Sequence, residues 1–254
     1  MKKFNFVLAR QGSRFDYSVE AGANDGQKHF DHHGVYSAEG SPCNRDIPEA
    51  EEGSTICVSH IDADTVVGLL KLTGRNLPEV DFDLMEQVDC NGSSVVRDLF
   101  NPTLLYMLGV GAKARELGIP RCPAEGFEDI TEALTLLLDT SAEELITLGR
   151  QQQEASEKAY NGCLVSREGN KALFAINATD ALDPSRSYKD EIDIVVVYRS
   201  HYKSISIYCN PSSAFAFAGE TLAGIPFAGH PKASGSPRGE SQTLEAAKAV
   251  FEAI

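Results

Sequence analysis

A buried strand that runs into an acidic loop and then into a helix constrains the fold more than any other feature. The run Thr55-Ile56-Cys57-Val58-Ser59 is typical of a buried β-strand, and residues 65–72 have apolar side chains at helical spacing before Gly74 ends the pattern. A strand, a polar loop and a helix in this order form the βα unit of an α/β domain. We therefore expect a mainly parallel sheet in the N-terminal part of the chain.

The apolar pattern divides the chain into two parts that a polar helix joins. In the first part we expect these further elements: strands at 4–9, 16–19 and 28–30, and helices at 84–89, 103–117 and 130–138. Ser141-Ala142-Glu143-Glu144 is a capping box that starts a polar helix, which runs to about residue 160. Beyond it the apolar period becomes two, which predicts the remaining elements: strands at 163–165, 173–176, 192–198 and 204–208, and a closing helix at 243–253.

The predicted architecture is therefore an α/β fold with two domains. Residues 1–140 form an N-terminal α/β domain with a mainly parallel sheet, and residues 141–160 form a helical linker. Residues 161–254 form a smaller C-terminal α/β domain with a mixed sheet. The Gly-rich segment 219–239 is expected to be a loop.

The charge of the chain limits its partners. The 37 Asp and Glu residues outnumber the 23 Lys and Arg residues, so the formal net charge is −14. Proteins that grip an extended nucleic-acid backbone need a basic surface, so we expect a small substrate instead. No apolar run is long enough for a membrane span and the N-terminus predicts no signal peptide, so we expect a cytoplasmic protein without a membrane partner. A homodimer is compatible with the sequence.

The cysteines predict no disulfide framework and no zinc ribbon. No two of them form a C-x-x-C pair. We expect reduced, mostly buried thiols at all six positions: Cys43, Cys57, Cys90, Cys122, Cys163 and Cys209.

Two acidic clusters that contain histidine are the candidates for a functional site. The first is Asp31-His32-His33, and the second, His60-Ile61-Asp62-Ala63-Asp64, follows the predicted strand. Catalytic groups in open α/β sheets gather at this end of the strands. In an extended conformation His60, Asp62 and Asp64 would point to one side, because side chains alternate with period two. Carboxylates and imidazoles without thiolates suit Mn²⁺ or Mg²⁺ better than structural zinc.

Each cluster has a simpler interpretation as a capped loop whose acids accept backbone amides. Two such clusters within about thirty residues, both beside predicted strands, instead favour a dinuclear metal site. Two divalent ions about 3.5–4 Å apart polarise a phosphoryl oxygen, lower the pKa of a bridging water and stabilise the leaving oxygen.

These clusters resemble motifs of the DHH phosphoesterase superfamily. Asp31-His32-His33 resembles its D-H-H motif, and His60-Ile61-Asp62-Ala63-Asp64 resembles its metal-binding H-x-D-x-D motif. The segment 227–235 (FAGHPKASG) is similar to the G-G-G-H-x-x-A-(A/S)-G signature of the small DHHA1-type domain, and Asp89 resembles the isolated Asp that completes the metal cluster. The resemblance implies a DHH-like catalytic domain over residues 1–140 and a DHHA1-like substrate-binding domain over residues 161–254.

The resemblance also implies roles for individual residues. It implies these metal ligands: Asp31, His32, His60, Asp62, Asp64 and Asp89. One histidine of the D-H-H motif would bind metal and the other would act at the scissile phosphate, and the sequence leaves open which of His32 and His33 does which. It implies these substrate contacts in the C-terminal domain: Gly229, His230, Lys232, Ser234 and Gly235. Arg238 is either a phosphate clamp or a surface arginine.

The chain departs from the family in three respects. D-H-H precedes H-x-D-x-D, the reverse of the family's order, so either the N-terminal motifs are permuted or one match is coincidental. Thr65 stands where the family often has Gly. The additional Asp that the family has before D-H-H has no clear counterpart, and Asp16 and Asp25 are the candidates.

The sequence therefore predicts a divalent-metal-dependent phosphoesterase with two Mn²⁺ ions, or Mg²⁺ in their place. Its substrate would be a small phosphorylated compound or a short nucleotide, hydrolysed by a metal-activated water. Relatives of this kind handle cyclic dinucleotides, nanoRNA, 3′,5′-bisphosphorylated nucleosides and pyrophosphate, so the substrate stays open. The alternatives are a catalytically impaired nucleotide-binding or regulatory module of the same fold and a metallohydrolase of another bond type.

Overall fold

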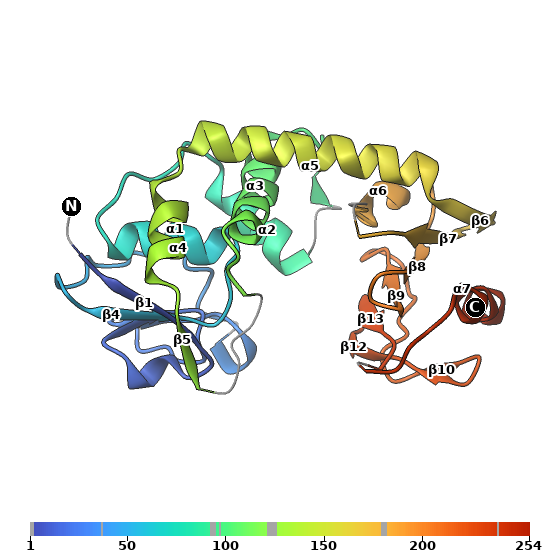
Figure 1. Ribbon diagram of the computed structural model, residues 1–254, viewed down its shortest axis with the longest axis horizontal. Helices are drawn as coiled ribbons and strands as arrows, with labels where there is room; N and C mark the ends of the chain where they lie inside the picture. Colours follow the sequence, from blue (N-terminus) through green and yellow to red (C-terminus); the bar gives the residue numbers. More distant parts are fainter. Residues whose placement is uncertain are drawn as a thin grey trace. The chain divides into compact units, whose positions relative to one another are not determined.

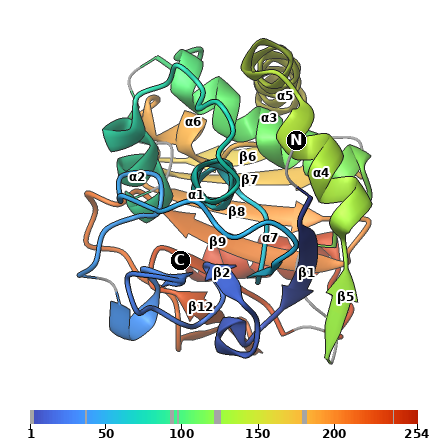
Figure 2. The ribbon, with the colours of Figure 1, turned by 90° about the vertical axis from the view of Figure 1, so that its left-hand side faces the viewer.

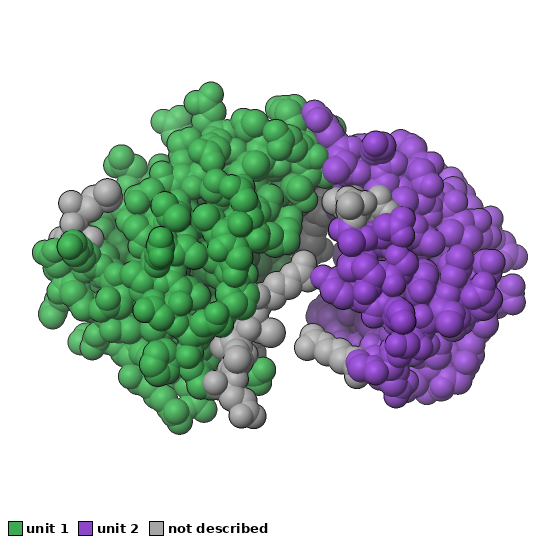
Figure 3. All heavy atoms as spheres, in the orientation of Figure 1, with its two compact units in different colours: residues 1–90, 98–152 green, residues 91–97, 153–254 purple. Residues whose placement is uncertain are grey.

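The chain folds into two compact units, which Figure 3 shows in different colours. The computed structural model describes residues 3–36, 38–91, 95–96, 98–120, 126–178, 182–237 and 239–254. The first unit comprises residues 1–90 and 98–152, and the second comprises residues 91–97 and 153–254. The long helix α5 (Ala142–Gly162) contributes to both units, so the segment predicted as a linker is shared between them.

The first unit is built on a five-stranded sheet with the order β3-β2-β4-β1-β5 (Figure 1). Its strands are β1 (Asn5–Ala9), β2 (Tyr17–Val19), β3 (His29–Phe30), β4 (Thr55–Val58) and β5 (Phe127–Asp129). The pairs β1–β4, β4–β2 and β2–β3 are parallel, and β5 joins the edge antiparallel to β1. The predicted mainly parallel sheet is therefore confirmed.

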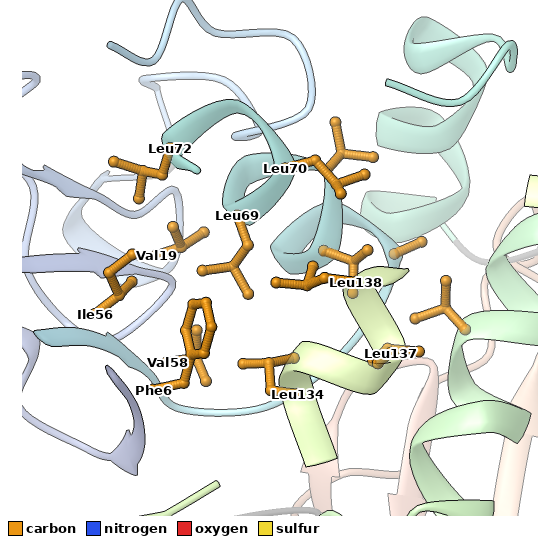
Figure 4. Close-up of a cluster of buried hydrophobic side chains, with 14 of the residues drawn as sticks. Phe6, Val19, Ile56, Val58, Leu69, Leu70, Leu72, Leu134, Leu137 and Leu138 are labelled. Carbon is orange, nitrogen blue, oxygen red and sulfur yellow. The ribbon is translucent and has the colours of Figure 1, made fainter. Parts of the chain in front are cut away.

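Helices cover one face of this sheet. They are α1 (Ala63–Leu72), α2 (Phe82–Asn91), α3 (Pro102–Glu116) and α4 (Thr131–Asp139), each within a few residues of the predicted bounds. Figure 4 shows the resulting core, in which Phe6 of β1 and Val58 of β4 meet Leu69 of α1 and Leu134 of α4. The side chains along these parallel strands are buried, so the polar residues that follow the strands lie at the carboxyl end of the sheet.

The second unit has a six-stranded sheet with the order β12-β13-β9-β8-β7-β6, of which Figure 2 shows β6 to β9 side by side. The strands are β6 (Leu164–Glu168), β7 (Lys171–Ile176), β8 (Ile194–Arg199), β9 (Ser204–Cys209), β12 (Ala228–His230) and β13 (Ala233–Gly235). Because β7 and β8 are parallel and the other pairs antiparallel, the predicted mixed sheet is confirmed. The helices α6 (Ser185–Tyr188) and α7 (Leu244–Ala253) complete the unit.

The expectation of a loop over residues 219–239 is wrong. This segment folds into two hairpins, one formed by β10 (Thr221–Leu222) and β11 (Ile225–Pro226) and the other by β12 and β13. The strand β13 continues the main sheet by pairing with β9. Gly and Ala residues weaken strand propensity, but the backbone hydrogen bonds offered by β9 override that preference.

Among the described helices, none is both long enough and apolar enough to cross a membrane.

Glycines set the close crossing of α3 and α5 within the first unit. A Cβ atom at Gly109 of α3 would overlap the carbonyl oxygen of Leu145, and one at Gly149 of α5 would overlap the carbonyl oxygen of Leu105. The two backbones therefore touch where neither helix has a side chain.

We expect Gly109→Ala to lower the free energy of unfolding by about 1–3 kcal/mol, because the two helices must move apart. The matched control is Gly111→Ala on the same helix, where the added Cβ would lie 3.5 Å from the Arg115 side chain. That variant should be more stable by about 0.5–1 kcal/mol, since Ala favours a helix interior. Urea unfolding of both variants measures the two free energies. A Gly109→Ala variant as stable as Gly111→Ala would contradict the close crossing of the helices.

Candidate metal centre

Three neighbouring parallel strands end at the candidate site. Glu20 follows β2, Asp31-His32-His33 follows β3, and the H-x-D-x-D segment follows β4. The strand order β3-β2-β4 puts Glu20 between the two motifs, because the carboxyl ends of parallel strands meet at one edge of the sheet. The reversed order of the motifs along the chain therefore does not separate them in space.

The carboxylate of Glu20 lies between two imidazoles. Its Oε1 atom is 2.8 Å from His32 Nε2, and its Oε2 atom is 3.0 Å from His60 Nε2. The hydroxyl of Thr65 donates a hydrogen bond of 3.1 Å to Oε2. Glu20 is 2% exposed and has a φ of 53°, in the left-handed region that costs a non-glycine residue of order 1–3 kcal/mol. Such strain at a buried acid is typical of a functional position.

Sequence reasoning missed Glu20 and considered two other acids. Asp16 accepts a hydrogen bond from the backbone N–H of Thr55, at the start of β4 and hence at the opposite edge of the sheet. Asp25 accepts hydrogen bonds from the backbone N–H groups of residues 27–29 and so caps a turn. Glu20 could have been found by the rule applied to His60, because it directly follows a predicted strand.

The expected extended conformation of the H-x-D-x-D segment is wrong. The strand β4 ends at Val58, and Asp62 is the N-cap of α1, accepting a hydrogen bond of 2.9 Å from Thr65 N. Asp64 lies in the first turn of that helix. An aspartate directly before a helical pattern favours this cap, and the helix then turns Asp64 back toward the sheet.

Asp62 and Asp64 nevertheless reach the same cluster. Asp62 Oδ2 is 2.9 Å from His60 Nε2, and Asp64 Oδ2 is 3.6 Å from His32 Nε2. The other oxygen of Asp64 accepts a hydrogen bond from Cys43 N. The helix start therefore brings two carboxylates to two different histidines.

The two histidines of the D-H-H motif have different surroundings. The His32 side chain is 7% exposed, and its Nε2 atom is 3.4 Å from Asp89 Oδ2. The His33 side chain is 55% exposed, and its Nδ1 atom is 3.3 Å from Asp31 Oδ1. Asp31 also accepts hydrogen bonds from the backbone N–H groups of Gly22 and His33. Thus His32 is enclosed by carboxylates, whereas His33, whose Nδ1 atom also lies 3.7 Å from Glu20 Oε1, is more than half exposed.

Three buried polar atoms in this cluster make no hydrogen bond with the described residues: Glu20 Oε1, His32 Nε2 and Asp64 Oδ2. Glu20 Oε1 and His32 Nε2 approach to 2.8 Å without hydrogen-bond alignment. Buried polar atoms are otherwise nearly always satisfied. These three residues also form one group whose ligand atoms lie within 4.8 Å of one another, and Glu20, His33 and His60 form a second. The donors therefore fit divalent ions.

The pKa values of two buried acids, Glu20 and Asp64, are shifted in opposite directions. Burial acts to raise the pKa of Glu20, but contacts with His32 and His60 hold it well below its usual range. Burial, followed by the charge of Glu20, raises the pKa of Asp64 to about 8. Burial, followed by the charge of Asp62, raises that of Asp89 to about 6.

The histidines are correspondingly basic. Contact with Glu20 raises the pKa of His32 to about 9. Burial acts to lower the pKa of His60, but contacts with Asp62 and Glu20 raise it to about 10. Contact with Asp31 raises the pKa of His33. Protons on the imidazoles therefore balance the carboxylates of this cluster, as divalent ions would.

Five of the six residues predicted to contact substrate lie on β12, β13 and the turn between them. A Cβ at Gly229, whose φ is 130°, would lie 2.9 Å from the carbonyl oxygen of Ala233, so the hairpin requires glycine there. His230 Nδ1 accepts a hydrogen bond from Lys232 N. Lys232 Nζ donates to the carbonyl oxygens of Ser213 and Phe215, so its side chain anchors that loop.

The other predicted contacts of the second unit are Ser234, Gly235 and Arg238. Ser234 is buried, and its hydroxyl makes no hydrogen bond within the described part of the chain. Gly235 pairs with Ser206 of β9. Arg238 lies outside the described residues. All six contacts stay predictions.

Sequence reasoning also missed Arg199 at the end of β8. Its guanidinium donates hydrogen bonds of 2.8 Å to the Ser206 and Tyr208 hydroxyls of β9. Ser206 and Tyr208 pair with Gly235 and Ala233, so the cation lies on a sheet face where the neighbouring strand has only small side chains.

The comparisons found no matching family model and no matching curated protein. The solved structures that are similar to this chain include the following three. The pGpG-specific phosphodiesterase PggH from Vibrio cholerae is 17% identical, with a TM-score of 0.48 over 93% of this chain and 83% of that one. RecJ in complex with Mg²⁺ from Thermus thermophilus is 14% identical, with a TM-score of 0.34 over 75% of this chain and 30% of that one.

The third structure, an exopolyphosphatase-related protein from Bacteroides fragilis, is 13% identical, with a TM-score of 0.32 over 92% of this chain and 80% of that one. Identities of 13–17% and TM-scores of 0.32–0.48 are too low to transfer an activity or a residue's role. The chemistry must therefore be derived from the site itself.

We expect the affinity for Mn²⁺ to rise with pH between about pH 6 and pH 9. Without metal, pKa values near 9 and 10 keep His32 and His60 protonated at neutral pH, and an ion binds only the neutral imidazole. Binding must therefore release protons, and raising the pH removes this competition. Titration calorimetry in buffers of different ionisation enthalpy measures both effects. An affinity independent of pH, without proton release, would contradict the assignment of these histidines as ligands.

Proposed function

We propose that this protein is a divalent-metal-dependent phosphoesterase that uses two Mn²⁺ ions to hydrolyse a small phosphorylated compound or a short nucleotide. The observation that supports this most is the position of Glu20, whose two oxygens approach the inner nitrogens of His32 and His60. One carboxylate shared by two donor sets suits a pair of ions rather than a single ion.

The two donor sets divide the cluster. His32, Asp64 and Asp89 would hold one ion, and His60 and Asp62 the other, with Glu20 shared by both. When bound, such a pair supplies an activated water and stabilises charge on the phosphoryl oxygens. The side chains of these six residues offer only nitrogen and oxygen atoms as ligands, which suit Mn²⁺ or Mg²⁺.

His33 is the residue of this cluster best suited to the leaving group. Asp31 holds its Nδ1 side, and more than half of its side chain is exposed. Its Nε2 atom would then donate a proton to the departing oxygen. Asp31, whose oxygens bind Gly22 N and His33, would position this histidine rather than bind metal directly.

The second unit would bind the part of the substrate that does not react. Arg199 is a half-buried cation at the end of β8, and a guanidinium held by two hydroxyls suits a phosphate. His230 and the backbone of the β12–β13 hairpin would add contacts. Binding energy of this kind orients the reacting phosphate without taking part in bond cleavage.

A screen in the presence of Mn²⁺ tests the proposed function. The substrates are cyclic dinucleotides, a linear dinucleotide such as pGpG, short RNA, 3′,5′-bisphosphorylated nucleosides and pyrophosphate. We expect turnover of one class, loss of turnover with EDTA and recovery with Mn²⁺. Glu20→Gln should reduce the bound metal from about two ions per chain and lower turnover to background, because the shared ligand loses its charge. Asp16→Asn, an acid outside the cluster, should change neither.

Two bound Mn²⁺ ions without turnover of any phosphoester would instead favour the regulatory module or a metallohydrolase of another bond type. Unchanged turnover in EDTA would remove the metal from the mechanism.

Two histidine variants separate the proposed roles. We expect His33→Asn to keep the metal content and to lower kcat by about 10²–10⁴-fold, the range for loss of a general acid. His230→Ala should also keep the metal content but lower kcat/KM by about tenfold or more, equivalent to losing a hydrogen bond to a charged group worth ~1.5–3 kcal/mol. Metal analysis with steady-state kinetics measures both. Loss of metal in His33→Asn would make His33 a ligand instead.

A further inference from the structure

A thiol lies beside the proposed metal centre. Cys90 directly follows Asp89 on α2, and its Sγ atom, a carboxylate oxygen of Asp89 and a ring nitrogen of His32 all lie within 4.8 Å of one another. Cys90 is exposed, whereas Cys43, Cys57 and Cys209 are buried. The sequence predicted a donor set without thiolates, whereas the fold brings a cysteine close to a histidine 58 positions earlier in the chain.

The surroundings of His32 point to a ligand at this position. Its side chain is 7% exposed, and its Nε2 atom makes no hydrogen bond with the described residues. It lies 3.4 Å from Asp89 Oδ2, a spacing that suits two ligands which each bind one ion at ~2.0–2.2 Å. Its closest approach, 2.8 Å from Glu20 Oε1, is not aligned for a hydrogen bond, and a metal ion between His32, Asp89 and Cys90 would give this buried nitrogen a bond.

We propose that Cys90 is a further ligand of the ion held by His32 and Asp89, and that it makes this position selective for a thiophilic divalent cation such as Zn²⁺ or Co²⁺. This inference rests on the proposed metal centre: it adds a donor, and Zn²⁺ or Co²⁺ would replace Mn²⁺ at this one position. The Sγ–metal bond forms as the S–H bond breaks, and the proton leaves to solvent, so no oxidant or reductant is needed.

The thiolate would make the centre asymmetric. Thiolates select softer ions, whereas carboxylates and imidazoles suit Mn²⁺. The ion near His60 is surrounded by nitrogen and oxygen donors from Glu20, Asp62 and His60 itself. The ion near His32 would gain sulfur in addition. We therefore expect one position to exchange readily between Mn²⁺ and Mg²⁺ and the other to prefer Zn²⁺ or Co²⁺.

Spectroscopy of the Co²⁺-loaded full-length protein tests the thiolate bond directly. A thiolate-to-cobalt charge-transfer band in the near ultraviolet should accompany Co²⁺ binding to the unchanged protein. Cys90→Ser should lose that band while the visible bands of bound Co²⁺ remain. Cys163→Ser is the matched control, since Cys163 lies in the second unit, and this variant should keep the charge-transfer band.

Two further measurements test the same bond with Zn²⁺, and the second of them uses the unchanged protein. Cys90→Ser should lower the affinity for Zn²⁺ by at least about tenfold and change that for Mn²⁺ much less. In the unchanged protein, Zn²⁺ should slow alkylation of Cys90 by iodoacetamide, followed by mass spectrometry, by about tenfold or more, because a metal-bound thiolate is a weaker nucleophile.

The outcomes separate this inference from the proposed function. Bound Co²⁺ without a charge-transfer band, or alkylation of Cys90 at the same rate with and without Zn²⁺, would overturn the role of Cys90 and leave the metal centre in place. Failure of Mn²⁺, Zn²⁺ and Co²⁺ alike to bind would overturn both.

Discussion

The contact of one buried carboxylate with two imidazoles organises the first unit. Glu20 reaches His32 with one oxygen and His60 with the other, and Thr65 donates to the second oxygen. A carboxylate that is 2% exposed needs such partners, because an isolated buried charge is strongly destabilised. The left-handed backbone of Glu20 at the end of β2 aims its side chain between the neighbouring strands, so local strain is offset by contacts to both sides.

The topology of the sheet makes this contact available. Because β2 lies between β3 and β4, whatever follows it must lie between the D-H-H and H-x-D-x-D motifs. Asp62 then serves two purposes: one oxygen caps α1 and the other meets His60. Thr65 connects these groups, since its N–H binds Asp62 and its hydroxyl binds Glu20. A glycine at position 65 would keep the hydrogen bond from its N–H to Asp62 but lose the one from the hydroxyl to Glu20. Thr65 therefore makes a contact with Glu20 that the glycine often found at this position in the DHH superfamily could not make.

The regular elements and the meeting of the two histidine motifs with Asp89 were predicted, whereas the positions of Glu20 and Cys90 were not. The strand over 55–58 and the helix over 63–72 follow from buried runs with a clear period, and both are present within a few residues of their predicted bounds. The hairpin over 228–235 was missed because pairing with β9 outweighs the low strand propensity of Gly and Ala. Cys90 was missed because contacts between residues far apart in the chain leave no local pattern. Glu20 does leave a local pattern, because it is an acid that directly follows a predicted strand, but this strand has only three residues.

The position of Glu20 also bears on whether the cluster is complete. An additional acid before D-H-H was expected from the resemblance, and its absence in the sequence favoured an impaired module. Glu20 precedes D-H-H by eleven residues and lies in the cluster, whereas Asp16 and Asp25 bind backbone amides elsewhere. A motif's place in the chain matters less than the strand it follows, because every parallel strand delivers its carboxyl end to the same edge. Reversing the order of two motifs in the chain therefore preserves the set of donors. Glu20 supplies the acid that Asp16 and Asp25 do not, and a cluster with this acid favours an active hydrolase over a module that has lost its ligands.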